Sequence, residues 1–335
     1  MNRKENLYHD ACLYWSVNDI CNLHCVYCYS NPGKESYLTK QNVNQSIALS
    51  VNKPISVITR KINKLFQIGL PSAIRIICSR RRHPRNHWIS KAIDSLALKN
   101  ALDKTNKIFM INLTGGEPFL IPNIVDVCAE ITKKHLLYIN TNLVSEKIKE
   151  FTERIDPQRV LGINASCHIK ELERLNLLDK YIYNFHLCKD KGFSIGATER
   201  AYPPLLGEVE KYKEFFKKRG IELAFAQFCG KYNGKLYPES YTDEEIKIFG
   251  LEKAPDIKMF HSKGKICNAG YNVGVLFSDG FVRPCYQINE SLGNIFDGIK
   301  FKKELIKCPH EYCGCPLNCY DKHLFEKALV ECGIK

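Results

Sequence analysis

Short apolar stretches alternate with amphipathic ones over the first two thirds of the chain. The apolar stretches are the length of buried strands and occupy residues 13–17, 107–113, 136–140, 160–166, 193–197 and 221–228. The segments between them repeat their apolar positions at helical spacing and carry their charges on one side. These predicted helices cover residues 122–134, 145–154, 171–191 and 206–219. After Gly230 the alternation stops.

Strand and helix in regular turn predict a parallel sheet with helical crossovers. Six strands can form an open doubly wound sheet or an incomplete barrel, and in either case ligands bind at the carboxyl ends of the strands. We therefore expect an α/β region over residues 1–230 and a smaller cysteine-rich region over residues 231–335.

One stretch fits this alternation poorly, because residues 42–101 are longer than one crossover requires. An insertion at about residues 70–100 holds a basic segment formed by Arg80, Arg81, Arg82 and Arg85. This segment either grips phosphate or an acidic partner, or is a solvated loop before a helix.

Composition narrows the class of protein. The chain has 16 cysteines among 335 residues but opens with the polar run "MNRKENLYHD" and no cleavable signal, which favours a reducing cytoplasm. In that compartment, closely spaced cysteines bind metal more often than each other. No apolar run approaches the length of a membrane span. The net charge of +13 is compatible with nucleic acid, an acidic peptide, an anionic sugar donor or no specific partner.

Three cysteines lie just after the first predicted strand, Cys21, Cys25 and Cys28 in "CNLHCVYC". Tetrahedral zinc usually takes four protein ligands, so this loop alone would leave a zinc site incomplete. A cubane iron–sulfur cluster tolerates three cysteines, because its fourth iron can hold an exogenous ligand. The loop therefore favours an iron–sulfur cluster with one open iron.

A second motif, "LTGGEP", follows the next predicted strand. Gly115 and Gly116 permit positive backbone torsions and close approach of a ligand, and Glu117 supplies an acceptor for an ammonium group. Pro118 is expected to fix the start of the following helix. By itself the motif could also be a tight turn with an exposed glutamate.

Together the two motifs resemble those of the radical S-adenosylmethionine (radical SAM) superfamily, including the aromatic Tyr27 before the last cysteine. The resemblance implies a partial (β/α)6 TIM-like barrel with a [4Fe-4S] cluster on the three cysteines. It also implies that the amine and carboxylate of SAM chelate the fourth iron, with Gly115, Gly116 and Glu117 holding the amine.

Weaker candidates for SAM contacts lie at other strand ends. Asn142 in "NTN" resembles the family's strand tip that faces the cofactor, Ser166 could bond a ribose hydroxyl, and Arg200 in "GATER" could meet the carboxylate of SAM. The alternative for each is a strand-end residue that bonds its own backbone.

Seven cysteines lie in the C-terminal region, and their order resembles the SPASM extension of radical SAM enzymes, with two further clusters, or its twitch relative, with one. They are Cys267, Cys285, Cys308, Cys313, Cys315, Cys319 and Cys332. The segment "VGVLFSDGFVRPC" predicts a hairpin turning at Asp279 and Gly280.

The last group departs from the family's spacing of two, five and three residues, because here four, one and three separate its cysteines. The number of auxiliary clusters therefore stays open, and Cys308, Cys313, Cys315 and Cys319 could instead bind zinc. The family pattern places Cys267, Cys285 and Cys319 on an inner cluster. Its missing ligand would be Cys229 or an open iron, unless only one cluster forms.

The resemblance implies an activity. A reductant such as flavodoxin or ferredoxin supplies an electron, and SAM is cleaved to a 5′-deoxyadenosyl radical that abstracts hydrogen from a substrate. A peptide or protein side chain is the favoured target, for oxidation, cross-linking or epimerisation. Only twenty residues precede Cys21, so a peptide leader would have to bind elsewhere. The alternatives are a small molecule such as a sugar derivative and a non-enzymatic iron–sulfur or zinc module; nucleic acid is the least favoured substrate.

Overall fold

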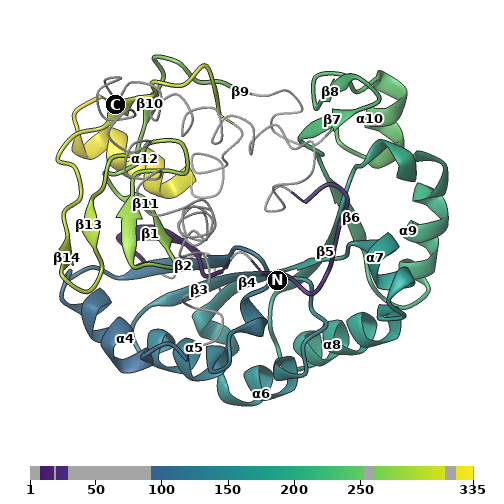
Figure 1. Ribbon diagram of the computed structural model, residues 1–335, viewed down its shortest axis with the longest axis horizontal. Coiled ribbons are helices and arrows are strands. Elements are labelled where there is room, and N and C mark those ends of the chain that lie inside the picture. Colours follow the sequence, from purple (N-terminus) through teal and green to yellow (C-terminus); the bar gives the residue numbers. More distant parts are fainter. Residues whose placement is uncertain (1–7, 19, 29–91, 253–259, 314–321, 335) are drawn as a thin grey trace, which may run out of the picture.

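A computed structural model of the protein describes residues 8–18, 20–28, 92–252, 260–313 and 322–334. Six parallel strands pair in chain order, as the sequence predicts. They are β1 (Ala11–Ser16), β2 (Phe109–Thr114), β3 (Leu136–Thr141), β4 (Val160–Ser166), β5 (Ile195–Arg200) and β6 (Leu223–Ala226). The sheet curves into an open partial barrel, with helices along its outer side (Figure 1). The predicted α/β partial barrel is confirmed.

The outer helices alternate with the strands, and short 3₁₀ turns precede some of them. The helices are α4 (Ser95–Asp103), α5 (Ile124–Thr132), α6 (Lys147–Arg154), α7 (Ile169–Arg174), α8 (Leu178–Asp190) and α9 (Val209–Lys217). The 3₁₀ turns are η1 (Pro118–Leu120), η2 (Pro157–Arg159) and η3 (Pro203–Glu208). Pro118 opens η1, so the predicted start after "LTGGEP" is correct.

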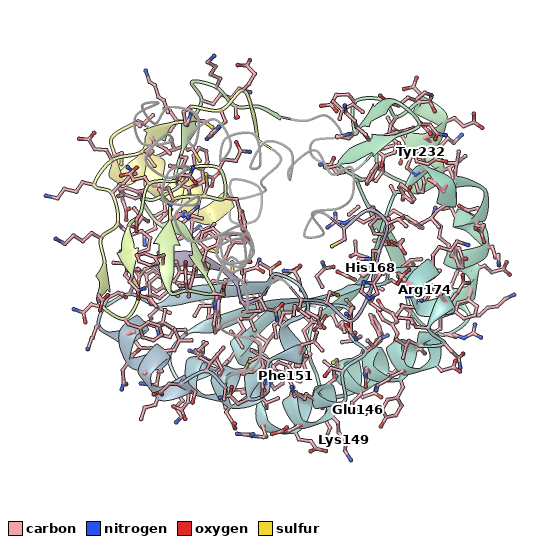
Figure 2. All side chains as sticks on the ribbon, viewed as in Figure 1. Glu146, Lys149, Phe151, His168, Arg174 and Tyr232 are labelled. Atoms are coloured by element: carbon pink, nitrogen blue, oxygen red, sulfur yellow. The ribbon has the colours of Figure 1, made fainter. Side chains whose placement is uncertain are left out.

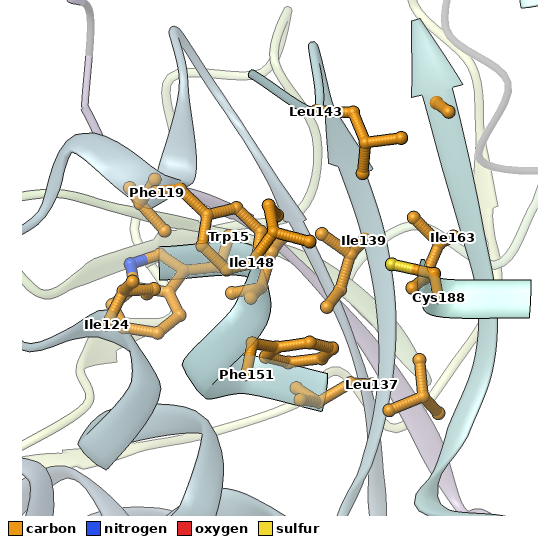
Figure 3. Close-up of a cluster of buried hydrophobic side chains, with 14 of the residues drawn as sticks. Trp15, Phe119, Ile124, Leu137, Ile139, Leu143, Ile148, Phe151, Ile163 and Cys188 are labelled. Atoms are coloured by element: carbon orange, nitrogen blue, oxygen red, sulfur yellow. The ribbon is translucent and has the colours of Figure 1, made fainter. Parts of the chain in front are cut away.

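Side-chain alternation in the strands makes two cores. Leu13 and Trp15 of β1 belong to the main core, where the outer side of the sheet meets the helices, and Figure 3 shows Trp15 there with Phe119 and Phe151. Tyr14, which points to the other side, belongs to a smaller core on the inner side of the barrel.

The structure differs from the predicted elements in two places. The helix predicted over residues 171–191 is two helices, α7 and α8, because Asn176 between them has φ 55° and cannot continue a right-handed helix. The fifth strand lies later than predicted and ends at Arg200, so Thr198, Glu199 and Arg200 belong to the strand.

The C-terminal region extends the same sheet. Strand β11 (Val273–Phe277) pairs in parallel with β1, and three short antiparallel strands follow it: β12 (Phe281–Arg283), β13 (Gly293–Asn294) and β14 (Gly298–Ile299). The hairpin between β11 and β12 turns at Gly280 with φ 84°, which confirms the predicted turn. The boundary near residue 230 remains a prediction.

The remaining elements are small. Strands β7 (Gly230–Tyr232) and β8 (Lys235–Tyr237) form a hairpin before α10 (Asp243–Phe249). Antiparallel pairs join β9 (Phe260–His261) to β16 (Tyr312–Cys313) and β10 (Ile266–Cys267) to β15 (Ile306–Lys307). The last helix, α12 (Lys322–Glu331), places Leu324 in the inner core. Across the described residues, we find no helix with the length and apolar character to cross a bilayer.

Candidate functional site

The cysteine loop and the glycine motif are joined through their backbones. Gly116 N donates to Asn18 O at 2.8 Å, and Glu117 N donates to Ile20 O at 2.7 Å. The Asn18 amide, itself buried, donates to Glu117 O at 3.0 Å. The two motifs predicted from separate parts of the sequence therefore form one unit at the carboxyl ends of β1 and β2.

The two glycines make room for this unit. A Cβ at Gly115, where φ is 119°, would lie 2.4 Å from Asn18 O, and a Cβ at Gly116 would lie 1.9 Å from Ile20 O. The close approach predicted at these glycines is therefore to the backbone that leads into the cysteine loop. The contacts of both glycines with SAM remain predictions.

Glu117 is buried, so the alternative of an exposed glutamate is wrong. Its carboxylate accepts from Thr141 Oγ1 at 2.8 Å, Phe119 N at 3.0 Å and Asn142 N at 2.7 Å. Burial raises the pKa of Glu117 to about 7, although these three donors act in the opposite direction. A carboxylate accepts about four hydrogen bonds, which leaves room for one more donor such as the predicted ammonium.

The end of β3 contacts the cysteine loop directly. Asn142, held by its backbone N–H to Glu117, donates its side-chain amide to Asn22 Oδ1 at 2.7 Å and to Cys21 Sγ at 3.6 Å. Leu23 N also donates to Cys21 Sγ, at 3.4 Å. Such N–H to sulfur bonds favour the thiolate, the form that binds iron.

Tyr27 ties the other side of the loop to β5. Its hydroxyl donates to Glu199 Oε1 at 2.7 Å and lies 3.2 Å from His168 Nδ1. Glu199 is buried and also accepts from Ile169 N and Arg200 N, both at 2.6 Å. Burial raises the pKa values of Tyr27 and Glu199 and lowers that of His168 to about 4. Because the Tyr27 hydroxyl uses its proton in the hydrogen bond to Glu199, the neutral His168 is the donor in the second bond, from Nδ1 to the Tyr27 oxygen.

A third tether reaches the loop from α7. Glu171 accepts from His24 N at 2.9 Å and is paired with Arg174 at 2.8 Å. His168 and Arg174, at the two ends of α7, lie on the same side of the molecule (Figure 2). The roles of Glu171, His168 and Glu199 could not be predicted from the sequence, since nothing along the chain relates these residues to a loop more than 100 residues earlier.

The three thiols of the loop are close enough to act on one another. Cys25 is buried, and burial together with the neighbouring Cys21 and Cys28 raises its pKa. In the part of the chain that the structure describes, no three histidine, cysteine or acidic side chains converge tightly enough to hold a metal ion as they stand. Three thiols on one anchored loop are nevertheless the donor set of a cubane cluster with an open iron, which Cys21, Cys25 and Cys28 would hold.

The weaker candidates lie at the same edge of the sheet. Ser166 ends β4 opposite Thr198 of β5, and Arg200 ends β5, where its guanidinium donates to Gln227 O at 3.4 Å. The structure thus brings them to the edge where the loop lies, and their contacts with SAM remain predictions.

The structure brings some of the C-terminal cysteines near the inner core and others to separate places. Cys267 and Cys285 both pack against the inner core. Cys308 follows β15, the partner of the strand that carries Cys267, and Cys332 lies beside Tyr271. Cys313 ends β16. Two further predicted ligands, Cys315 and Cys319, and the basic segment from Arg80 to Arg85 lie outside the described residues.

Cys229, the candidate for the missing ligand, follows β6. Figure 1 shows β6 and β10 on opposite sides of the barrel opening, so the structure does not bring Cys229 to Cys267.

The fold and this site define a partial barrel of the radical SAM type with an antiparallel C-terminal extension. Among solved structures, anSMEcpe with bound AdoMet and Kp18Cys peptide has 18% identity and a TM-score of 0.50, covering 86% of this chain and 78% of that one. Streptococcus suis SuiB bound to precursor peptide SuiA has 13% identity and a TM-score of 0.48, and the match covers 86% of this chain and 63% of that chain. At 18% identity the likeness to anSMEcpe is one of fold.

A relative is also found by sequence, the GTP 3′,8-cyclase of Clostridium perfringens (strain SM101 / Type A). It is 24% identical over 151 residues, which make up 43% of this chain and 47% of the cyclase, so the chain spans about half the length of that relative. No family model matches the chain. The predicted resemblance to radical SAM enzymes is thus confirmed in the fold.

Proposed function

We propose that this protein is a radical SAM enzyme that abstracts hydrogen from a peptide or protein side chain. The observation that carries the proposal is the union of the cysteine loop with "LTGGEP", where Gly116 and Glu117 bond the backbone leading into Cys21. A bound cluster would supply one electron to the sulfonium of SAM, which splits into methionine and a 5′-deoxyadenosyl radical. That radical would take one hydrogen atom from the substrate and become 5′-deoxyadenosine, leaving the unpaired electron on the substrate.

The residues of the chain would provide position and shielding. Asn142, Glu199 and Glu171 each hold one side of the loop by a hydrogen bond, so the loop that would hold the cluster is fixed at the strand ends. Glu117 has one acceptor site left for the amine of SAM. Gly115, Gly116, Ser166 and Arg200 are the further proposed contacts.

The test of the reaction is production of 5′-deoxyadenosine by the anaerobically reconstituted protein with dithionite. Replacing Cys21, Cys25 and Cys28 by alanine should remove about four irons per chain and all SAM cleavage. Cys128→Ala is the matched control, since Cys128 is a buried thiol on α5, away from the loop. Cleavage that survives the triple replacement would refute the assignment.

We further propose that the C-terminal cysteines hold one or two auxiliary [4Fe-4S] clusters. Support comes from Cys267 and Cys285, which border one core, and from Cys308, which follows the strand paired with that of Cys267. Iron and sulfide analysis should give about eight or about twelve of each per chain. A value of about four, with zinc present, would instead assign Cys308, Cys313, Cys315 and Cys319 to zinc.

A peptide substrate is supported by anSMEcpe, whose structure holds AdoMet and a peptide. The cyclase relative, named for GTP, supports a second candidate, radical rearrangement of a small molecule. Chromatography of GTP incubated with the reduced enzyme separates the two candidates. Consumption of GTP would favour the small molecule, and unchanged GTP would favour the peptide. We place the enzyme in the cytoplasm, with flavodoxin or ferredoxin as the reductant.

A further inference from the structure

A line of asparagines crosses the inner side of the barrel. Asn140 of β3 donates to Asn112 Oδ1 of β2 at 2.7 Å and to Leu113 O at 3.3 Å, and Asn164 of β4 donates to Asn140 Oδ1 at 3.0 Å. We name these three residues the asparagine ladder. Asn140 and Asn164 are opposed in register, so the ladder runs across the strands.

The ladder has a fixed direction. Leu113 O can only accept, so the amide nitrogen of Asn140 must face it and Asn140 Oδ1 must face Asn164. Asn164 therefore spends one N–H on Asn140 and keeps its Oδ1 and its second N–H. Among the described residues neither of these groups has a hydrogen-bond partner, so Asn164 presents an acceptor and a donor together.

The ladder borders a pocket of about 210 Å³. Asn164, Thr198 and Ser194 supply its polar groups, and Tyr138 lies over Gly162, where a Cβ would be 2.9 Å from the ring. At Gly196 a Cβ would meet no atom of the described residues within 4 Å, so they leave space on that side of the pocket. None of the described side chains that line the pocket carries a charge.

The pocket lies one layer of side chains below the proposed radical site. Asn164 is two residues before Ser166, and Asn140 is two residues before Asn142, which contacts the cysteine loop. Two residues of strand span about 7 Å. A group held in the pocket would thus sit beneath the strand ends where SAM is proposed to bind.

We propose that this pocket receives an uncharged peptide unit of the substrate, with its amide paired to Asn164 and a small side chain over Gly196. This inference rests on the proposed function and names its substrate class. An amide offers one donor and one acceptor, which match the two groups left on Asn164. No described residue that lines the pocket would balance the charge of a phosphate or carboxylate, and burial of an unbalanced charge carries a large desolvation penalty.

The test uses N-acetyl-L-alanine N-methylamide as the probe, with ligand-observed saturation-transfer NMR on the reconstituted full chain with SAM. Gly196→Val should fill the open side of the pocket and displace the probe from Asn164. Saturation transfer to the probe should then fall about fivefold or more, because the probe loses a hydrogen bond and its contacts. Gly207→Val is the matched control, because a Cβ at Gly207 also meets nothing within 4 Å but lies outside the pocket.

Asn164→Leu provides an independent variant of similar volume, should Gly196→Val fail to fold as judged by circular dichroism. It too should lose transfer to the amide. Equal transfer in either folded variant and the wild type overturns the proposal. So does Gly196-dependent transfer to methyl glucoside that exceeds transfer to the amide, which would assign the pocket to a sugar. Formation of 5′-deoxyadenosine is measured separately, so a failed pocket and a failed radical reaction are distinguishable.

Discussion

At the scale of single residues, His135 shows how burial sets the protonation of a group away from the site. Its ring is fully buried, Nδ1 accepts from Phe109 N at 3.2 Å, and Nε2 lies 3.2 Å from Asp103 Oδ1. Burial lowers the pKa of His135 to about 4, because the charged ring would have to be desolvated.

His135 should make the protein less stable in mild acid. Its pKa is near 6.5 in the unfolded chain and about 4 in the folded one, so the unfolded chain binds more protons between these values. The free energy of unfolding therefore keeps the contribution of His135 above pH 6.5 and loses it as the pH falls towards 4. The loss between pH 7 and pH 5 is about 2 kcal/mol. Urea unfolding of His135→Gln should show a shallower loss with acid than the wild type.

His186→Gln is the control for this experiment, because that ring lies on the surface of α8 and bonds only Arg219 O among the described residues. The control should follow the wild type. Equal acid sensitivity of all three proteins would contradict the prediction.

Tyr27 offers a second residue-scale prediction. Tyr27→Phe removes the hydroxyl between Glu199 and His168 and leaves a buried carboxyl short of a donor, at about 1–3 kcal/mol. We expect faster loss of iron from the reconstituted protein to a chelator. Tyr183→Phe, which changes a tyrosine that is 62% exposed on α8, should lose iron at the wild-type rate. Identical rates for the two variants would show that the hydroxyl does not anchor the loop.

At the scale of elements, the site consists of strand ends joined by one loop. β1 leads into the cysteines, β2 into the glycines, β3 into Asn142 and β5 into Glu199. Each contact that anchors the loop comes from a different element, so the shape of the loop depends on the register of the sheet. Local sequence preference alone would not fix it.

Gly116→Ala should displace the cysteine loop. Its Cβ would overlap Ile20 O, a backbone atom that cannot rotate away, so the hydrogen bonds between the two motifs must break. The expected result is loss of the N-terminal cluster, read as a loss of about four irons, with a lower melting temperature. Gly207→Ala, a change into open space, should retain its iron. Full iron content in Gly116→Ala would show that the cysteine loop does not depend on the close contact between Gly116 and Ile20.

The sequence was sufficient to predict the six strands, the hairpin at Gly280 and the two motifs, because each has a local signature of periodicity or spacing. It could not give the partner of Tyr27 or the second role of Asn142, since these depend on which strand ends meet. It also could not show that backbone from the preceding loop lies against the two glycines, because that contact depends on how β1 and β2 pair.

At the scale of the whole molecule, the barrel and the C-terminal region share one sheet. β11 pairs with β1 along its length, and Val275 opposite Tyr14 is fully buried in the inner core. Stability of the first strand should therefore depend on residues far beyond the predicted boundary near residue 230.

Val275→Ala tests this dependence. Loss of two buried methyl groups should destabilise the pair of strands by about 2 kcal/mol and speed amide hydrogen exchange in β1 as well as in β11. Val209→Ala, the same change at a buried position beginning α9, should leave exchange in β1 as it is in the wild type. Unchanged exchange in β1 of Val275→Ala would show that the two regions open independently.

The pairing of β1 with β11 also bears on how the chain folds as it is made. Cys12 and Val273 are partners about 260 residues apart, a contact of very high order. Until the ribosome has released β11, one side of β1 has donors and acceptors with no strand beside them, on an otherwise apolar segment. Nascent chains of this protein should therefore be most prone to aggregate late in synthesis, and a chaperone that covers sheet edges should matter more for its yield than one that acts on the first completed helices.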